Sequence, residues 1–510
     1  MLRRDLLKSL ATAPLGLATV PFLSANQTMP AARYQPNWES IDARPTPSWY
    51  TEAKFGIFIH WGVYSVPAYA AVNVKDENPY AEWYWNSLTS GMDSAASSGH
   101  GAATWAFHKR VYGSDVTYFE FAPQFRAELY DPDHWADLFV RSGARYVALT
   151  SKHHEGFTLW RSVQANDSWG RPWNAVDIGP KRDLLVDLMQ AGRQKGLHMG
   201  IYYSLYEWYN PLWLTNKQKY VTDHLFPQFK DVVTHVKPAI IFSDGEWELS
   251  SAEWHAPELL AWLFNESPVA DSVVIDDRWG SDTRHKHGGY YTTEYTSGMQ
   301  QSSHPWEENR GMGYSYGYNR AETLSDYHSS RQLTLMLIDI VSRGGNLLLD
   351  IGPRADGMIP VVMEERLTQI GNWLRPNGEA IYGTTALKRP AQWSAGSLPQ
   401  LEQKEFRAPY DISELVDHPR PGYAHIEAFF TQKGNTIYAI LPRWPQGEIS
   451  LHGLSASSSA KANLLGSQRE ISLQSRGRDL VLAIPDSLRA GQPSQEAYVI
   501  RLEGVHEAAT

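Results

Sequence analysis

Two carboxylates in this sequence occupy positions from which a carboxyl group could do covalent or acid–base chemistry. Asp244 directly follows the run Ile240–Ser243, which has the composition of a buried strand, and Glu294 lies within the aromatic segment Tyr290–Tyr295. A carboxylate after a buried strand can be a nucleophile, a metal ligand or the cap of the next helix. From this segment alone, a helix cap is at least as favoured as a catalytic role. Aromatic neighbours desolvate a carboxyl and raise its pKa, as a general acid near neutral pH requires. A retaining glycosidase needs one carboxyl group that attacks and another that donates a proton.

Histidines form a second group with possible chemistry. His153 and His154 lie together in Ser151–Phe157, and His60 follows another apolar run. Adjacent residues on a strand point to opposite faces, so His153 and His154 could share a metal only beyond the end of a strand. The sequence has no Cys and no H-E-x-x-H spacing. Substrate hydrogen bonding is therefore the favoured interpretation, ahead of structural histidines and then of a metal site, and we expect neither a metal nor a cofactor.

An arginine follows the next predicted strand in the same way. Arg278 stands in Asp276–Gly280, where it could hold a carboxylate or a sugar hydroxyl. Polar and aromatic residues also collect after other predicted strands. Active sites of parallel barrels form at the carboxyl ends of the strands, so this distribution favours a barrel.

The elements that must position these residues alternate between strands and helices from Lys54 to about Gly383. The predicted strands are Phe55–His60, Tyr146–Ser151, Leu197–Tyr203, Ala239–Ser243, Ser272–Asp276 and Asn346–Ile351. The predicted helices are Asp133–Ser142, Asp183–Lys195, Thr215–His235, Ala252–Phe264, Ser325–Ser342 and Pro360–Leu374. Repeated strand–helix units of this length predict an α/β fold with a (β/α)8 TIM-like barrel, which we assign to residues 34–385. Tyr64–Tyr118 is a long insertion after the first strand.

The pattern changes after Gly383. Short alternating runs separated by turn residues replace the helical period. The predicted strands are Ala424–Thr431, Thr436–Leu441, Glu448–Leu451, Leu480–Ile484 and Ala497–Leu502. Residues 390–505 are therefore predicted to form a C-terminal antiparallel β-sandwich.

Composition limits the partners that this protein could have. The chain has 510 residues and a net charge of −10, and no basic run lies beyond its N-terminus, which argues against nucleic-acid binding. It contains 20 Trp and 27 Tyr. Most of these are expected in the core, but some could line a groove in which aromatic faces pack on sugar rings.

The N-terminus indicates export. Arg3 and Arg4 precede Leu6–Lys8 and a short apolar stretch that is interrupted by Gly and Pro. This arrangement is typical of a signal peptide of the twin-arginine type, and we assign it to residues 1–25. The alternative to a cleaved signal peptide is that these N-terminal residues form an uncleaved anchor or a disordered arm. We expect export to a bacterial periplasm and no membrane association after cleavage.

Several motifs in order resemble glycoside hydrolase family 29, the α-L-fucosidases, and most closely its bacterial, exported members. They span nearly all of residues 34–385 and are Lys54–Gly62, Glu82–Tyr84, Lys152–Phe157, Tyr202–Ser204, Phe242–Trp247, Asp277–Gly280, Gly317–Arg320 and Ser342–Pro353. The resemblance implies a retaining exo-α-L-fucosidase that acts on fucosylated oligosaccharides or glycoconjugates through a covalent fucosyl-enzyme. It gives no oligomeric state.

The resemblance also implies roles for individual residues. Asp244 would be the nucleophile, and Glu294, in a Thr-x-Glu-Tyr segment, the general acid/base, with Glu307 and Glu308 as rivals. Contacts to the fucose hydroxyls and ring would come from His60, Glu82, Trp83, His153, His154, Tyr203 and Arg278. An apolar pocket for the C6 methyl group would come from Phe58, Tyr80 and Tyr316. Phe242 departs from the family, which often has Trp there.

Two other functions remain open from the sequence. One is a retaining barrel glycosidase for another sugar, such as an α-galactoside. The other is a non-catalytic carbohydrate-binding protein on a barrel that has lost its activity. The presence of both candidate carboxylates and of the expected histidines argues against the second.

Overall fold

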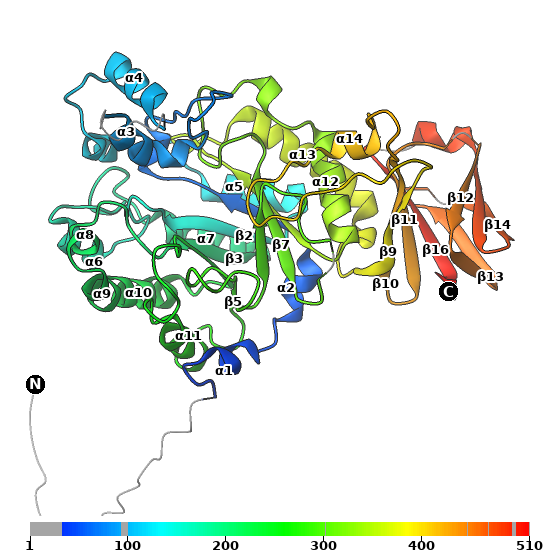
Figure 1. Cartoon of the computed structure of the whole chain (residues 1–510), viewed down its shortest axis with the longest axis horizontal. Coiled ribbons are helices and arrows are strands. Elements are labelled where there is room, and N and C mark those ends of the chain that lie inside the picture. The colour runs from blue at the N-terminus through cyan, green and yellow to red at the C-terminus, as the bar shows by residue number, and fades with distance from the viewer. Residues whose placement is uncertain are drawn as a thin grey trace, which may run out of the picture. The chain divides into compact units, whose positions relative to one another are not determined.

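The computed structural model describes residues 33–92, 100–300, 302–445, 447–467, 469–491 and 496–508 (Figure 1). The predicted export signal lies outside these residues. Among the described residues, no helix is long and apolar enough to cross a bilayer.

Eight parallel strands form the first sheet, which confirms the barrel-like α/β fold. They are β1 (Phe55–Ile59), β2 (Tyr146–Lys152), β3 (His198–Ser204), β4 (Ile240–Asp244), β5 (Val274–Ile275), β6 (Tyr291–Glu294), β7 (Trp306–Gly311) and β8 (Asn346–Ile351). Their order is β5-β4-β3-β2-β1-β8-β7-β6. Because β1 pairs with both β2 and β8, the first and last strands of the series are neighbours, as curling of the sheet requires.

The residues of each strand alternate between the interior and the helices. Phe58, Tyr202 and Phe242 belong to an interior cluster of rings and aliphatic side chains. Their neighbours Ile57, Tyr203 and Ile241 belong to the larger core outside the sheet. This alternation decides which side chains can reach a site at the centre of the barrel.

Helices follow the strands and cover the outside of the sheet. The predicted helices correspond to α5 (Pro132–Ser142), α7 (Leu184–Gln194), α10 (Phe226–Val236), α11 (Ala256–Asn265), α12 (Ser330–Ser342) and α13 (Val361–Asn377). The predicted helix Thr215–His235 is divided, because α9 (Lys217–Tyr220) passes through a π-helical turn before α10 begins. Side chains cap the N-termini of several helices, including Asp183 at α7 and Ser329 at α12. The remaining helices are α1 (Trp38–Asp42), α2 (Ser48–Ala53), α3 (Tyr84–Met92), α4 (Ala102–Val111), α6 (Val163–Trp169), α8 (Pro211–Thr215) and α14 (Ile412–Val416).

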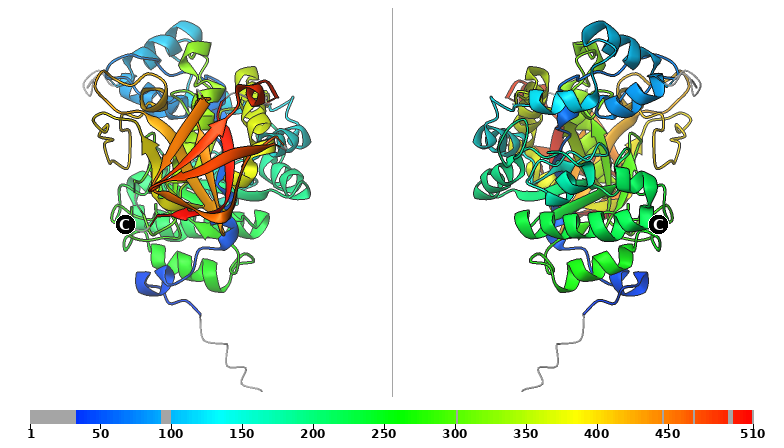
Figure 2. Two further views of the ribbon diagram at one scale, coloured as in Figure 1. Left: turned by 90° about the vertical axis from the view of Figure 1, so that its right-hand side faces the viewer. Right: turned by 90° about the vertical axis from the view of Figure 1, so that its left-hand side faces the viewer.

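An antiparallel sheet of eight strands follows the barrel, as predicted (Figure 2). The strands are β9 (Thr385–Trp393), β10 (Ile426–Lys433), β11 (Thr436–Leu441), β12 (Gly447–His452), β13 (Leu454–Leu464), β14 (Glu470–Arg476), β15 (Asp479–Ile484) and β16 (Tyr498–Glu507). The order β12-β15-β14-β13-β16-β11-β10-β9 places β9 and β12 at opposite edges. These edges nevertheless meet, because the Gln392 side chain donates to Ser450 O (2.8 Å) and accepts from His452 N (2.8 Å). The sheet thus folds over its own apolar core in the manner of a sandwich.

Helices α12 and α13 connect this sheet to the barrel. Helix α12 packs against β9 and β10. Arg331 of α12 forms a two-pronged ion pair with Asp417, and Trp373 of α13 donates to Ala497 O (2.9 Å). The first contact holds the segment between β9 and β10 on α12, and the second holds the start of β16 on α13.

Candidate active site

A cavity of about 650 Å³ opens at the carboxyl ends of the parallel strands. All of the site residues predicted from the sequence line it except Tyr203. The cavity also contains residues that the sequence analysis did not assign, namely Tyr202, Phe242, Glu246, Trp247, Ser281, Asp282, Arg284, Lys286, Asn309, Glu405 and Phe406. Its position agrees with the general location of active sites in parallel barrels.

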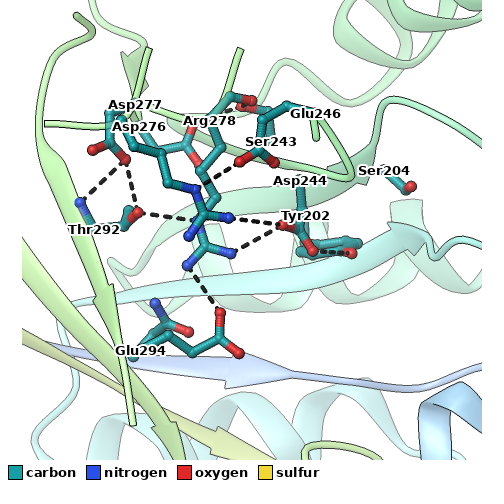
Figure 3. Close-up of polar contacts among 12 residues, drawn as sticks. Tyr202, Ser204, Ser243, Asp244, Glu246, Asp276, Asp277, Arg278, Thr292 and Glu294 are labelled. Carbon is teal, nitrogen blue, oxygen red and sulfur yellow. Dashed lines mark hydrogen bonds and ion pairs between the residues drawn. The ribbon is translucent and has the colours of Figure 1, made fainter. Parts of the chain in front are cut away.

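Asp244 ends β4, and two side chains donate hydrogen bonds to its carboxylate. Arg278 Nη1 donates to Oδ1 at 2.9 Å, and the Tyr202 hydroxyl donates to Oδ2 at 2.8 Å (Figure 3). His154 Nε2 lies 3.5 Å from Oδ2. Burial raises the pKa of Asp244, but the charges of Arg278 and Arg284, together with the hydrogen bond from Tyr202, hold that pKa well below its usual range. Asp244 is therefore ionised and oriented, as a carboxylate nucleophile must be.

Arg278 joins the two candidate carboxylates. Its Nη1 donates to Asp244 while its Nη2 donates to Glu294 Oε2 at 3.0 Å. Its Nε donates to Thr292 Oγ1 at 3.0 Å, and the Thr292 hydroxyl donates in turn to Asp277 at 2.7 Å (Figure 3). The guanidinium also lies 4.7 Å from the centre of the Phe242 ring, so the Phe found where the family often has Trp supports this arginine. A planar guanidinium with fixed partners brings Asp244 and Glu294 into one site.

Glu294 is the last residue of β6 and lines the cavity. The rival carboxyls lie on the next strand, β7, and neither lines the cavity. Glu307 accepts from Tyr50 and Tyr146, and burial raises its pKa to about 8. Glu308 accepts from Thr293 and Thr296, and burial raises its pKa to about 7. Geometry therefore favours Glu294 over both rivals.

Tyr203 is a correction to the predicted site. It faces away from the cavity, and its hydroxyl donates to Gln228 at 2.8 Å, behind the sheet. Tyr202 faces the cavity instead, because successive residues of β3 point to opposite sides. The motif Tyr202–Ser204 thus contributes Tyr202 to the cavity, one position before the tyrosine that the resemblance implies.

The three histidines all line the cavity. Strand β2 ends at Lys152, so His153 and His154 lie beyond it and can both point inward. The Ser204 hydroxyl donates to Tyr206 O (2.7 Å) and so accepts from His154 Nδ1 (2.6 Å). Burial lowers the pKa of His154, which makes it a neutral ring whose Nε2 can accept a hydrogen bond. His60 is oriented by Asp350, 2.7 Å from its Nδ1.

The long insertion after β1 supplies one wall of the cavity. Glu82 is buried there, and it accepts from Gly317 N (2.8 Å) and Ser315 (3.2 Å). Trp83 packs against Trp208 with ring centres 4.9 Å apart. The insertion folds as helices α3 and α4 around this wall.

The three residues predicted to surround a methyl group form a continuous aromatic surface. The ring centres of Phe58 and Tyr316 are 6.1 Å apart, and those of Tyr80 and Tyr316 are 5.8 Å apart. Phe58 also packs against Phe242 at 4.9 Å. Such a surface suits a small apolar substituent.

No group of three or more His, Cys, Asp or Glu side chains is arranged to hold a metal ion in the part of the chain that the structure describes. The paired carboxylates, the arginine between them and the neutral histidine instead form an arrangement suited to acid–base and nucleophilic chemistry on a polyhydroxylated substrate.

Comparisons with known proteins agree with this geometry. Residues 22–379 match the family described as alpha-L-fucosidase, and residues 424–503 match the alpha-L-fucosidase C-terminal domain. The chain is 36% identical to the human tissue alpha-L-fucosidase over 514 residues, which covers 98% of this chain and 99% of that protein. It is 44% identical to a Dictyostelium discoideum alpha-L-fucosidase over 362 residues, which covers 69% of this chain and 75% of that protein. The crystal structure of a Thermotoga maritima alpha-fucosidase in complex with a mechanism-based inhibitor superposes with a TM-score of 0.73 and 34% identity, covering 92% of this chain and all of that one.

Proposed function

This chain belongs to the α-L-fucosidase family of glycoside hydrolases, and we propose that it releases terminal α-L-fucose from fucosylated oligosaccharides or glycoconjugates with retention of configuration. The observation that carries this proposal is the single guanidinium of Arg278 between two carboxylates of one cavity. Retaining glycosidases use two such carboxyl groups in different roles.

In the first step, the carboxylate of Asp244 attacks the anomeric carbon of fucose. The bond between that carbon and the glycosidic oxygen breaks, and Glu294 gives its proton to the departing oxygen. The product of this step is a fucosyl ester of Asp244. Arg278 and Tyr202 hold the attacking group before the reaction, so little reorganisation is needed.

In the second step, Glu294 takes a proton from water as the water attacks the same carbon. The ester bond breaks, Asp244 leaves as a carboxylate, and fucose is released with its original configuration. Two inversions at one carbon account for the retention.

Recognition of fucose is assigned to the rest of the inner cavity. We assign the contacts to the hydroxyls and the ring to six residues that line the cavity, namely His60, Glu82, Trp83, His153, His154 and Tyr202. Phe58, Tyr80 and Tyr316 would enclose the methyl group, and a dry pocket there favours L-fucose over L-galactose, which has a hydroxyl on C6, by roughly 1–3 kcal/mol.

The substrate assignment is tested by comparing an aryl α-L-fucoside with the aryl α-D-galactoside, whose sugar belongs to the opposite configurational series and carries a hydroxyl at C6. We expect faster turnover of the fucoside and, by proton NMR, α-L-fucose as the first product. Faster turnover of the galactoside, release of β-L-fucose, or binding of fucosides without hydrolysis would each contradict the proposal.

We further propose that residues 1–25 are a twin-arginine export signal and that the mature protein acts in a bacterial periplasm. The support is the Arg3–Arg4 pair followed by a short apolar stretch. Replacing both arginines by Lys should leave the protein in the cytoplasmic fraction of a bacterial host. Unchanged export of that variant would argue against a twin-arginine signal.

A further inference from the structure

A segment from the C-terminal region, residues 405–407, borders the strand that carries Glu294. Strand β6 is an edge of the parallel sheet, with β7 on its other side. Glu294 N donates to Glu405 O (2.9 Å), and Arg407 N donates to Glu294 O (2.9 Å), which forms a parallel bridge between Glu294 and Phe406. Both backbone polar groups of Glu294 are therefore bonded to residues far away in sequence.

The side chain of Phe406 is free of this pairing. The two bonds use the carbonyl of Glu405 and the N–H of Arg407, so the Phe406 ring is not needed for them. The ring lines the active-site cavity and is 45% exposed. Because the ring is exposed inside the cavity, a ligand bound there can pack against its face.

Arg407 anchors the segment from the other side of Phe406. Its Nε donates to the Tyr80 hydroxyl at 2.9 Å, and its guanidinium lies 4.3 Å from the centre of the Tyr80 ring. Tyr80 belongs to the aromatic surface proposed for the fucose methyl group. The position of Phe406 is thus fixed relative to both Glu294 and the fucose pocket.

The exposed rings of the cavity lie on two different walls. Among the cavity residues that the structure describes, Trp247 and Phe406 are the large apolar side chains that remain exposed, at 40% and 45%. The Trp247 ring packs against His154, at 5.4 Å, on the side of the fucose hydroxyls. Phe406 instead adjoins Glu294, the group proposed to protonate the glycosidic oxygen. The sugar bonded to fucose through that oxygen must lie on the same side as Glu294.

We propose that Phe406 is a specificity-determining residue for the leaving group, and that its ring stacks on the apolar face of a pyranose bonded to fucose. This inference rests on the proposed function and adds the residue that recognises the leaving group as a sugar ring rather than a small alcohol. Stacking of an aromatic ring on the C–H face of a sugar resembles other aromatic contacts in magnitude. The C-terminal region thereby contributes a substrate contact to a site built by the barrel.

The test compares two fucosides that both need a proton from Glu294. One is a disaccharide of fucose α-linked to galactose, and the other is methyl α-L-fucoside, whose leaving group has no ring. The Phe406→Ala variant should lose about three- to tenfold in kcat/KM on the disaccharide and stay within about twofold on the methyl fucoside. Phe406→Tyr should retain the wild-type ratio, because it keeps the ring. Tyr423→Ala is the matched control, since Tyr423 is another exposed aromatic residue (46%) of the C-terminal region and does not line the cavity.

Three other outcomes would contradict either this inference or the proposed function. An equal loss on both substrates would overturn the inference, because it would show that Phe406 acts through the position of Glu294. An unchanged disaccharide reaction would overturn it as well. A wild-type protein that hydrolyses neither fucoside would contradict the proposed function itself.

Discussion

Arg278 is the residue on which the chemistry of the site depends most. It is buried, it reaches both candidate carboxylates, and its own orientation is fixed by Thr292 and Asp277. Asp244 lies in a site whose burial alone would raise the pKa of a carboxyl. The positive charge of Arg278 is what reverses that effect and keeps the nucleophile ionised.

Replacing Arg278 by Met should therefore change the pH dependence of the reaction as well as its rate. Without the guanidinium, burial raises the pKa of Asp244, so the acidic limb of the kcat/KM profile should move to higher pH. We also expect kcat/KM at neutral pH to fall on the order of 100-fold, as after loss of other charge-stabilising donors. The measurement is kcat/KM across the acidic range.

Arg284→Met provides the control for this prediction. Arg284 Nη2 lies 3.9 Å from Asp244 Oδ1, so its loss should shift the acidic limb less. An acidic limb that stays in place in Arg278→Met would show that Arg278 does not set the ionisation of Asp244.

At the residue scale, a sequence motif identifies most side chains of the site, but it does not decide which of two adjacent residues faces the cavity. The sequence placed Asp244, the histidines and Arg278 in the cavity, because each follows a recognisable strand or belongs to a distinctive motif. It misplaced one tyrosine, since Tyr202 and Tyr203 are adjacent and only the register of β3 decides which one faces inward. A shift of one residue exchanges the two faces of a strand.

At the scale of elements, apolar periodicity did not predict the strands that have polar sequences. Strands β6 and β7 read Tyr-Thr-Thr-Glu and Trp-Glu-Glu-Asn-Arg-Gly, without an apolar run. They are nevertheless largely or fully buried, because their polar side chains bond to one another and to tyrosines inside the barrel. The C-terminal strands β9, β13 and β14 also lack a clear apolar run, but most of their residues are exposed or half-buried. Apolar periodicity detects strands buried by hydrophobic packing and overlooks strands buried by hydrogen bonding.

Glu307 of β7 makes the interior of the barrel sensitive to pH. Its pKa in the folded protein is raised to about 8 by burial, above the ordinary value of 4.5. The folded state thus binds its proton more tightly than the unfolded state. The resulting stabilisation is complete below about pH 4.5 and is lost as the pH rises through about 8. Between pH 5 and 9, the free energy of unfolding of the wild type should fall by up to about 4 kcal/mol more than that of Glu307→Gln.

Denaturant unfolding of the two proteins at several pH values measures this difference. Glu365→Gln serves as a control, because Glu365 is exposed on α13 and should leave the wild-type pH dependence unchanged. Parallel curves for Glu307→Gln and the wild type would contradict a buried, protonated Glu307.

At the scale of the whole molecule, the alternation of apolar runs with helical periods predicts the barrel, and the short alternating runs after Gly383 predict the antiparallel domain that follows it. The contact between residues 405–407 and β6 had no signal in the sequence. It joins an irregular segment to a polar strand that was itself unrecognised, and it depends on how the C-terminal region packs on α12 and α13. Contacts of this kind follow from the folded arrangement and leave no local pattern. They also explain why Phe406, a residue outside every motif, reaches the active-site cavity.

The central claim is that Asp244 attacks the sugar and that Glu294 exchanges the proton. Chemical rescue by azide of Asp244→Ala and Glu294→Ala tests both roles, with the configuration of the fucosyl azide read by NMR. An external anion that fills the space of the lost nucleophile should give Asp244→Ala an inverted, β-configured azide. In Glu294→Ala the azide should instead attack the fucosyl-enzyme and give the retained, α-configured product. An α-configured azide from Asp244→Ala, or a Glu294→Ala variant that hydrolyses a fucosyl disaccharide at the wild-type rate, would contradict the account.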